Sequence, residues 1–202
     1  MPLFIFQLLV LLGSVIIHEV AHGAVAERLG DPTARLLGRI TLNPLKHIDP
    51  VGSILVPLFL SLIPGGVVFG WAKPVPYNPA NLKRPDRDGA LIALAGPVSN
   101  LILAVVFGIV VRVLATVPGY AAFIDLATLI VIVNISLAIF NLVPIPPLDG
   151  SKLLYAILPA SAGALRQTLE RYGLFILVAF IWFGAQFLGP IIFTIFRFLV
   201  GS

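Results

Sequence analysis

The sequence predicts an all-α protein that crosses a membrane several times, with about four to six transmembrane or re-entrant helical segments and a small membrane-associated β element. Of the 202 residues, 59% are hydrophobic and only 11% are charged, whereas a soluble domain carries about 25% charged residues. Five long runs lack any Asp, Glu, Lys or Arg, and each approaches or exceeds the ~18–20 residues with which an apolar helix spans a bilayer. These runs are residues 1–18, 50–72, 89–111, 126–148 and 172–196.

The first half of the chain is expected to contain one long helix and the β element. Residues 3–29 read as a helix that ends at Gly30, since glycine commonly follows a helix C-terminus. In the polar loop of residues 30–50, the stretch LLGRITL favours a short strand. Residues 67–79 begin with β-prone residues and end in prolines, which suits an edge strand better than a helix.

The second half is expected to be helical around one proline-rich break. Residues 89–117 and 121–142 indicate two helices joined by a short turn. The sequence VPIPPLDG at 143–150 cannot continue the helix, because proline lacks the amide N–H and clashes with the preceding turn. A short helix is expected near 150–158, and the last apolar run, 172–200, is expected to be interrupted at Gly189-Pro190.

We expect one domain over residues 1–202, because no repeat or linker divides the chain. Its motif-bearing core covers about residues 10–155, and a C-terminal transmembrane segment covers about residues 170–200. Met1 is followed by neither a basic region nor a clear cleavage site, which argues against a cleavable signal peptide. Cysteine is absent, so no disulfide forms.

The basic residues predict how the chain is threaded. If residues 51–70 spanned the bilayer, the basic loops at 28–46 and 73–87 would lie on opposite sides, with four Lys or Arg in each. If the segment enters and returns, eleven of the thirteen basic residues share the cytoplasmic side, as the positive-inside rule favours. We therefore predict a re-entrant segment in a multi-pass membrane protein, with a full span as the alternative.

The sequence IIHEVAHGA at residues 16–24 carries the pattern H-E-x-x-H inside the first apolar helix. Residues i and i+4 share a helix face, so His18 and His22 can bind one metal ion. Glu19 lies roughly 100° around the helix and can reach a metal-bound water as a general base. A glutamate in a membrane helix is costly and is interpreted as functional by default.

A catalytic zinc usually has three protein ligands, and few residues can supply the third. The candidates are His47, Asp49, Asp125 and Asp149, since the chain has three histidines and no cysteine. The predicted threading puts Asp149 on the same side as His22 and Asp125 on the other side. Asp149 is therefore the best candidate, although an aspartate in LDG could equally be a helix N-cap.

Several stretches together resemble the site-2 protease family of intramembrane zinc metalloproteases, in its short prokaryotic form without PDZ or CBS domains. They are HEVAHG at 18–23, TLNPLKHIDPVG at 41–52, FGWAKPVPYNP at 69–79, AGPVSN at 95–100 and FNLVPIPPLDG at 140–150. The resemblance implies that Zn²⁺ is held by His18, His22 and Asp149, with Glu19 as the base. Asn141 matches the family asparagine that binds the scissile carbonyl or its oxyanion. The resemblance also implies a multi-pass protein of a prokaryotic inner or plasma membrane, and the active site is expected to open towards the cytoplasm.

Two further residues have open interpretations. Asn100 lies in an apolar helix and either hydrogen-bonds a zinc ligand or joins two helices. His47 either supports the metal site or contacts substrate, or, as the pattern favours, stabilises a turn together with Asp49.

The resemblance implies a hydrolase that cuts peptide bonds within or near transmembrane segments of membrane proteins. Its partners would be a substrate with a transmembrane helix and the lipid bilayer, with no nucleic acid; the sequence indicates no oligomeric state. One alternative is an inactive relative that binds membrane helices, against which the intact motif residues argue. Another is a metal transporter, which would need polar residues spaced through the membrane.

Overall fold

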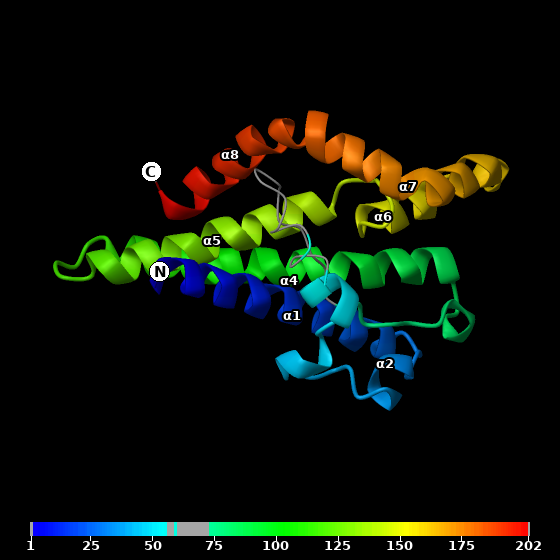
Figure 1. Cartoon of the computed structure of the whole chain (residues 1–202), viewed down its shortest axis with the longest axis horizontal. Coiled ribbons are helices and arrows are strands. Elements are labelled where there is room, and N and C mark those ends of the chain that lie inside the picture. The colour runs from blue at the N-terminus through cyan, green and yellow to red at the C-terminus, as the bar shows by residue number, and fades with distance from the viewer. Residues whose placement is uncertain (1, 56–58, 60–72, 202) are drawn as a thin grey trace.

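A computed structural model of the chain describes residues 2–55, 59 and 73–201, and this part of the chain is helical (Figure 1). The long helices are α1 (Pro2–Arg28), α4 (Pro85–Leu114), α5 (Ala121–Asn141), α7 (Gly163–Phe183) and α8 (Leu188–Val200). The short ones are α2 (Thr33–Leu36), η1 (Pro44–Lys46), η2 (Pro50–Leu55), η3 (Pro79–Asn81), α6 (Gly150–Ile157), η4 (Ala160–Ala162) and η5 (Ala185–Phe187).

Three helices are long and apolar enough to cross a membrane, namely Ile5–Arg28, Pro85–Leu114 and Ala121–Asn141. The pair α7 and α8, bent by 60°, adds a fourth if it counts as one broken span. Only 28–33% of the most apolar window in each of the three helices is buried within the protein, so most of their apolar surface remains for lipid. The chain is therefore a multi-pass membrane protein. Its described residues contain three or four candidate spans, against the four to six transmembrane or re-entrant segments expected.

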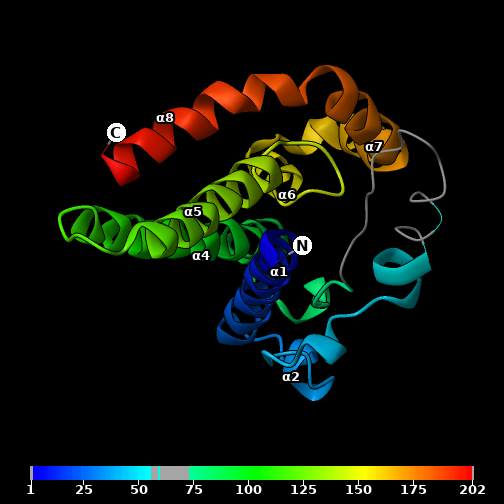
Figure 2. The same cartoon turned by 60° about the vertical axis from the view of Figure 1, so that its left-hand side comes forward.

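Helix α4 is the centre of the bundle. It packs against α1, α5, α6 and α8, while α7 and α8 arch along one side (Figure 2). Ala104, Val131 and Ile135 form a buried core between α4 and α5, and apolar residues of α8 cover it. At Gly108 of α4 a Cβ atom would lie 3.2 Å from the Leu199 carbonyl oxygen, so the small residue lets α8 approach closely.

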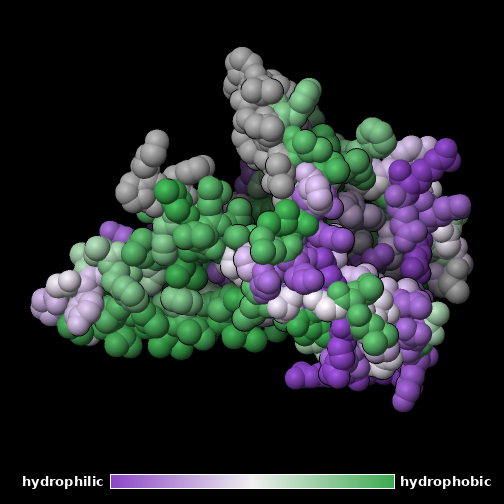
Figure 3. Space-filling view, turned by 60° about the horizontal axis from the view of Figure 1, so that its bottom comes forward, coloured by the Kyte–Doolittle hydropathy of each residue, from purple (hydrophilic) through white to green (hydrophobic). Residues whose placement is uncertain are grey.

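Polar residues gather at one end of the molecule, and apolar residues cover the helices that extend from it (Figure 3). The polar end includes the loop after α1, which turns at Gly30 with a φ of 107°. Such a φ favours glycine, and the expected stop of the first helix is thus confirmed.

The β element expected in the first half is wrong for the described residues. The stretch at 36–42 forms a helix end, turns and a bend, and residues 73–78 are irregular without strand pairing; residues 67–72 lie outside the described part. Backbone carbonyls that would pair with a neighbouring strand are hydrogen-bonded by a side chain instead. The buried Arg39 guanidinium donates to the carbonyls of Lys46, Lys73 and Pro74. Prolines in the segment also cannot donate to a ladder.

The expected break at Gly189-Pro190 is also misplaced. The chain bends at Gly184 and η5, whereas Gly189 and Pro190 belong to the first turn of α8. Proline is tolerated there because the first N–H groups of a helix have no intrahelical partner.

Asp31 joins the loop after α1 to the segment before α4. Its buried carboxylate accepts hydrogen bonds from the Thr33 N–H and hydroxyl, the Asn78 N–H and the Asn81 amide. Burial by itself would raise the pKa of Asp31, but these four hydrogen bonds outweigh it and hold the pKa below its ordinary value. The carboxylate therefore remains an acceptor that keeps the two segments together.

A backbone contact brings the two basic loops together. The Lys73 N–H donates to the His47 carbonyl at 2.9 Å, so the chain returns at residue 73 to the place it left at residue 47. Asp31 and Asn78, one from each loop, are likewise in direct contact at 2.7 Å. The re-entrant path predicted for residues 51–70 lies largely outside the described residues, but these contacts join its flanks.

We expect accessibility tags near residue 35 and near residue 80 to report the same side of the membrane. Reporter fusions or impermeant labelling of intact cells can measure this, with a tag in the turn between α4 and α5, near residue 119, as the opposite-side control. Labelling of residues 35 and 80 from opposite sides would show that a full span separates them.

Candidate active site

His18 and His22 lie on one face of α1 that is turned into the bundle. Both residues are buried, at 6% and 9% exposure, and their ring centroids are 4.6 Å apart. This is the arrangement that the i, i+4 spacing predicts for two ligands of one ion.

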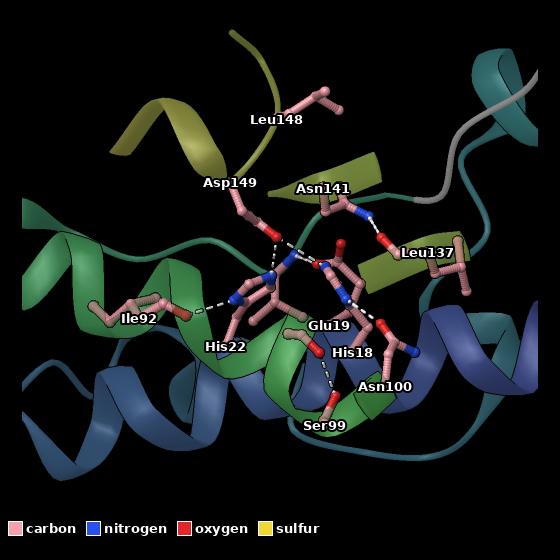
Figure 4. A network of polar contacts seen from close by, with 12 residues as sticks. His18, Glu19, His22, Ile92, Ser99, Asn100, Leu137, Asn141, Leu148 and Asp149 are labelled. Atoms are coloured by element: carbon pink, nitrogen blue, oxygen red, sulfur yellow. Dashed lines mark hydrogen bonds and ion pairs between the residues drawn. The ribbon is translucent and has the colours of Figure 1, made fainter. Parts of the chain in front are cut away.

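Asp149 meets the two histidines from the proline-rich break after α5. Its Oδ2 atom lies 3.1 Å from His18 Nε2 and 3.3 Å from His22 Nε2 (Figure 4). Asp149 occupies the N-cap position of α6, but its side chain makes no capping hydrogen bond. Of the two interpretations that the sequence left open, the geometry favours the ligand.

The other candidates for a third ligand lie elsewhere. Asp125 is in the second turn of α5, whose far end carries Asn141. Among the described residues, the ligand atoms of His18, His22 and Asp149 form a cluster in which all lie within 4.8 Å of one another. His47 and Asp49 are in the loop near η1 and are not part of this cluster.

The hydrogen bonds behind the histidines determine where their protons lie. His18 Nδ1 donates to the Asn100 side-chain oxygen at 2.6 Å, and His22 Nδ1 donates to the Ile92 carbonyl at 2.7 Å. Both acceptors need a proton on Nδ1, so each neutral imidazole presents a lone pair at Nε2.

Three lone-pair donors therefore converge at one buried point. Within the described part of the chain, nothing donates a hydrogen bond to Asp149 Oδ2. Ligand atoms about 2.0–2.2 Å from a tetrahedral zinc ion are about 3.3–3.6 Å from one another. The two distances from Asp149, 3.1 and 3.3 Å, are close to the lower end of this range. The two nitrogens and one carboxylate oxygen would thus fit the ligand set of a catalytic Zn²⁺ ion.

Glu19 lies beside this cluster and is held by the segment that Arg39 and Asp31 anchor. Its Oε2 atom accepts a hydrogen bond from the Val75 N–H at 2.7 Å. Val75 and Pro74, from that segment, line the same cavity as Glu19. The loop between the first helix and α4 therefore sets the orientation of the carboxylate.

A cavity of ≈ 250 Å³ opens over the cluster. Glu19 and the three clustered side chains line it, as do Asn141, Tyr77 and Lys152. Asn141 is the last residue of α5, as expected, and its amide nitrogen donates to the Leu137 carbonyl at 2.9 Å (Figure 4). An amide nitrogen carries two protons, so this bond uses one of them.

Asn100 accepts a hydrogen bond from His18. On its other side, Asn100 contacts two residues that the sequence analysis did not identify. Asn134 and Ser14 are buried and hydrogen-bonded to Asn100. The sequence could have indicated Asn134, because it is a polar amide inside the charge-free apolar run of residues 126–148. His47 is 1% exposed and its Nε2 donates to the Thr41 carbonyl, a contact within its own loop.

The family of the chain follows from its similarity to known proteins. The model of Peptidase family M50 matches residues 6–123 and 116–184. The chain belongs to peptidase family M50. No solved protein structure matches it.

Relatives of this M50 peptidase are described as zinc metalloproteases. YwhC of Bacillus subtilis is 40% identical over 189 residues, which cover 90% of this chain and 81% of YwhC. Rip2 of Mycolicibacterium smegmatis is 31% identical over 145 residues, covering 68% of this chain and 51% of Rip2. MJ0392 of Methanocaldococcus jannaschii is 29% identical over 157 residues, covering 77% of this chain and 35% of that protein.

Gly96 of α4 makes the cluster of this M50 peptidase compact. A Cβ atom at this position would lie 2.5 Å from the His18 ring and 2.6 Å from the His22 ring. Real Cβ contacts are not this short, so any side chain here would displace the rings. The glycine of AGPVSN therefore lets α4 pack directly on the two histidines.

We expect Gly96→Ala to weaken zinc binding by at least about tenfold, because displaced ligands lose affinity as readily as ligands whose supporting contacts are removed. Helix content should be retained, since alanine is the better helix former. Metal analysis and circular dichroism of the purified variant measure both. Gly13→Ala is the matched control, because a Cβ atom there meets nothing within 4 Å. Equal zinc content in the two variants would contradict the role of Gly96.

Proposed function

We propose that this M50 peptidase is an intramembrane zinc metalloprotease that cuts peptide bonds within or near transmembrane segments of membrane proteins. The observation that carries the proposal is the cluster of His18, His22 and Asp149 beside Glu19. The two histidines and Glu19 lie on a helix that is apolar enough to span a membrane. The names of the relatives support zinc as the ion. Residues 1–202 would act as one transmembrane domain.

The three clustered side chains would hold the ion, and Glu19 would move the proton. Zinc, when bound, lowers the pKa of a coordinated water to about 7 and polarises a carbonyl oxygen. Glu19 Oε2 is held by the Val75 N–H, so we assign Oε1 to accept the proton of the attacking water. The same carboxylic acid then delivers the proton to the leaving amine.

Asn141 would stabilise the negative charge that develops on the reacting carbonyl oxygen. It lines the cavity beside the cluster, and one proton of its amide is engaged with the Leu137 carbonyl. The second proton can be donated to a substrate oxygen. Such a donor is most effective in a site from which water is excluded.

The substrate would be a membrane protein whose helix unwinds locally at the cut. A peptide bond inside a helix is shielded by side chains and engaged in backbone hydrogen bonds, so part of the helix must open before attack. Pro74, Val75 and Tyr77, from the second basic loop, line the cavity, which therefore lies next to the polar loops. By the positive-inside rule this end faces the cytoplasm of a prokaryotic cell, and water would enter from there.

Co-expression with candidate single-span proteins tests the function. We expect the wild-type enzyme to produce a shortened product, Glu19→Gln to keep zinc and lose cleavage, and Asp149→Ala to lose both. Asp125→Ala, at the other end of α5, is the control that should retain both. Retained zinc in Asp149→Ala together with loss in Asp125→Ala would contradict the ligand set. Metal transport in liposomes without any proteolysis would instead favour a transporter.

We expect Asn141→Ala to bind zinc and melt near the wild-type temperature while kcat falls by about 10²–10³, the usual cost of removing one oxyanion donor. A purely structural role would instead lower stability by about 1 kcal/mol with little effect on the rate. Ser136→Ala is a matched control, because Ser136 makes the same kind of bond to the Ile132 carbonyl of α5. The measurement is cleavage rate per zinc-loaded enzyme in liposomes. A rate for Asn141→Ala near that of the control would show that Asn141 is structural.

A further inference from the structure

A chain of buried polar side chains runs from His18 to the neighbouring helices. Asn100 of α4 and Asn134 of α5 have 0% exposure, and Ser14 of α1 has 4%. The links are His18 to Asn100 at 2.6 Å, Asn100 to Asn134 at 2.8 Å and Asn134 to the Ser14 hydroxyl at 2.9 Å. These hydrogen bonds thus connect α1, α4 and α5 behind the metal cluster.

The orientation of the Asn134 amide is determined by its own helix. Its nitrogen lies 2.9 Å from the Ile130 carbonyl oxygen, and a carbonyl can only accept a hydrogen bond. The nitrogen must therefore face Ile130 and the Ser14 hydroxyl, and the Asn134 oxygen must face Asn100.

The orientation of Asn100 follows from that of Asn134. The Asn100 nitrogen donates to the Asn134 oxygen at 2.8 Å and to the Ser14 carbonyl at 3.3 Å, and neither atom can donate in return. The Asn100 oxygen is thereby left facing His18 Nδ1 (Figure 4).

The opposite orientation of Asn100 would change the chemistry of His18. An amide nitrogen facing Nδ1 would require a lone pair there, and the proton of the neutral imidazole would move to Nε2. That proton would point at Asp149 Oδ2, 3.1 Å away, and the two groups would close on each other with a hydrogen bond. His18 would no longer offer a lone pair to a metal ion.

We infer that Asn134 is a positioning residue that acts through Asn100 to keep the proton of His18 on Nδ1. The inference rests on the proposed zinc ligation by His18 and adds to it a buried relay of Ser14, Asn134 and Asn100. The relay pre-organises the ligand before any metal arrives. It therefore affects metal affinity and the state of the metal-free protein, in addition to the rate.

Two variants of similar size separate the relay from simple packing. Asn134→Leu removes the acceptor that faces Asn100, whereas Asn134→Asp keeps an oxygen there. We expect Asn134→Leu to weaken zinc binding by about 10–100-fold, the usual cost of losing the support behind a metal ligand. Asn134→Asp should retain most of the affinity. Ser136→Ala, a polar deletion in the same helix, is the control for helix packing. Chelator competition with the purified, full-length protein measures each affinity.

The tautomer of His18 is the readout that packing alone would not change. The chain has three histidines, so ¹⁵N-histidine spectra of the metal-free protein can be assigned with His22→Gln and His47→Gln. At a pH where the imidazoles are neutral, the wild type and Asn134→Asp should carry the His18 proton on Nδ1. Asn134→Leu should shift it towards Nε2.

A double substitution gives an independent test that uses a second site. In Asn100→Asp both side-chain oxygens can accept from His18, so the orientation of this residue ceases to matter. Adding Asn134→Leu to Asn100→Asp should then cause little further loss of zinc affinity. An equal loss in both backgrounds, or unchanged affinity or an unchanged tautomer in Asn134→Leu, would overturn the relay. Loss of zinc in Asp149→Ala would still support the metal site itself, so the two proposals fail separately.

Discussion

The structure depends on bringing three electron-pair donors to one buried point without a proton between them. The Asp149 carboxylate oxygen lies 3.1 and 3.3 Å from the two imidazole nitrogens in a bundle of apolar helices, and such groups are costly to bury unless a cation joins them. Each neighbouring feature serves this requirement. Asn100 and the Ile92 carbonyl take the Nδ1 protons, and Gly96 leaves room for both rings. The break after α5 allows Asp149 to approach from a separate helix.

The polar loops are tied to this site by side chains instead of a sheet. The Arg39 guanidinium donates hydrogen bonds to backbone carbonyls of both loops. The Asp31 carboxylate accepts hydrogen bonds from donors in both loops. Together they place the Val75 N–H against Glu19. The orientation of the proposed base therefore depends on residues far from it in the chain. An open strand edge at this position would leave unpaired N–H and C=O groups, which the side chains here satisfy.

The sequence predicted the helices well and the loops poorly. The helix of the first motif and the two helices that follow the basic loops appear near their expected bounds, because long apolar runs have few other stable forms in a membrane. The β element was wrong for the described residues, since alternation and β-prone residues cannot reveal that Arg39 replaces a neighbouring strand. The bend in the last apolar run was placed at Gly189-Pro190 and lies at Gly184 instead. Proline signals a helix start as readily as a helix break.

By itself the sequence determined that the protein spans a membrane several times and that His18, Glu19 and His22 share one helix, because composition and i, i+4 spacing are local properties. The resemblance of the motifs suggested Asp149 as the third zinc ligand. From the sequence pattern alone, this aspartate could equally be a ligand or a helix N-cap. Only the tertiary structure decided where its carboxylate points and which ring nitrogen of each imidazole carries the proton. It also showed that Asn134 and Ser14 are hydrogen-bonded to Asn100, the partner of His18. Those outcomes depend on distances between residues that lie 34 to 131 positions apart in the chain, and no local pattern in the sequence encodes such distances.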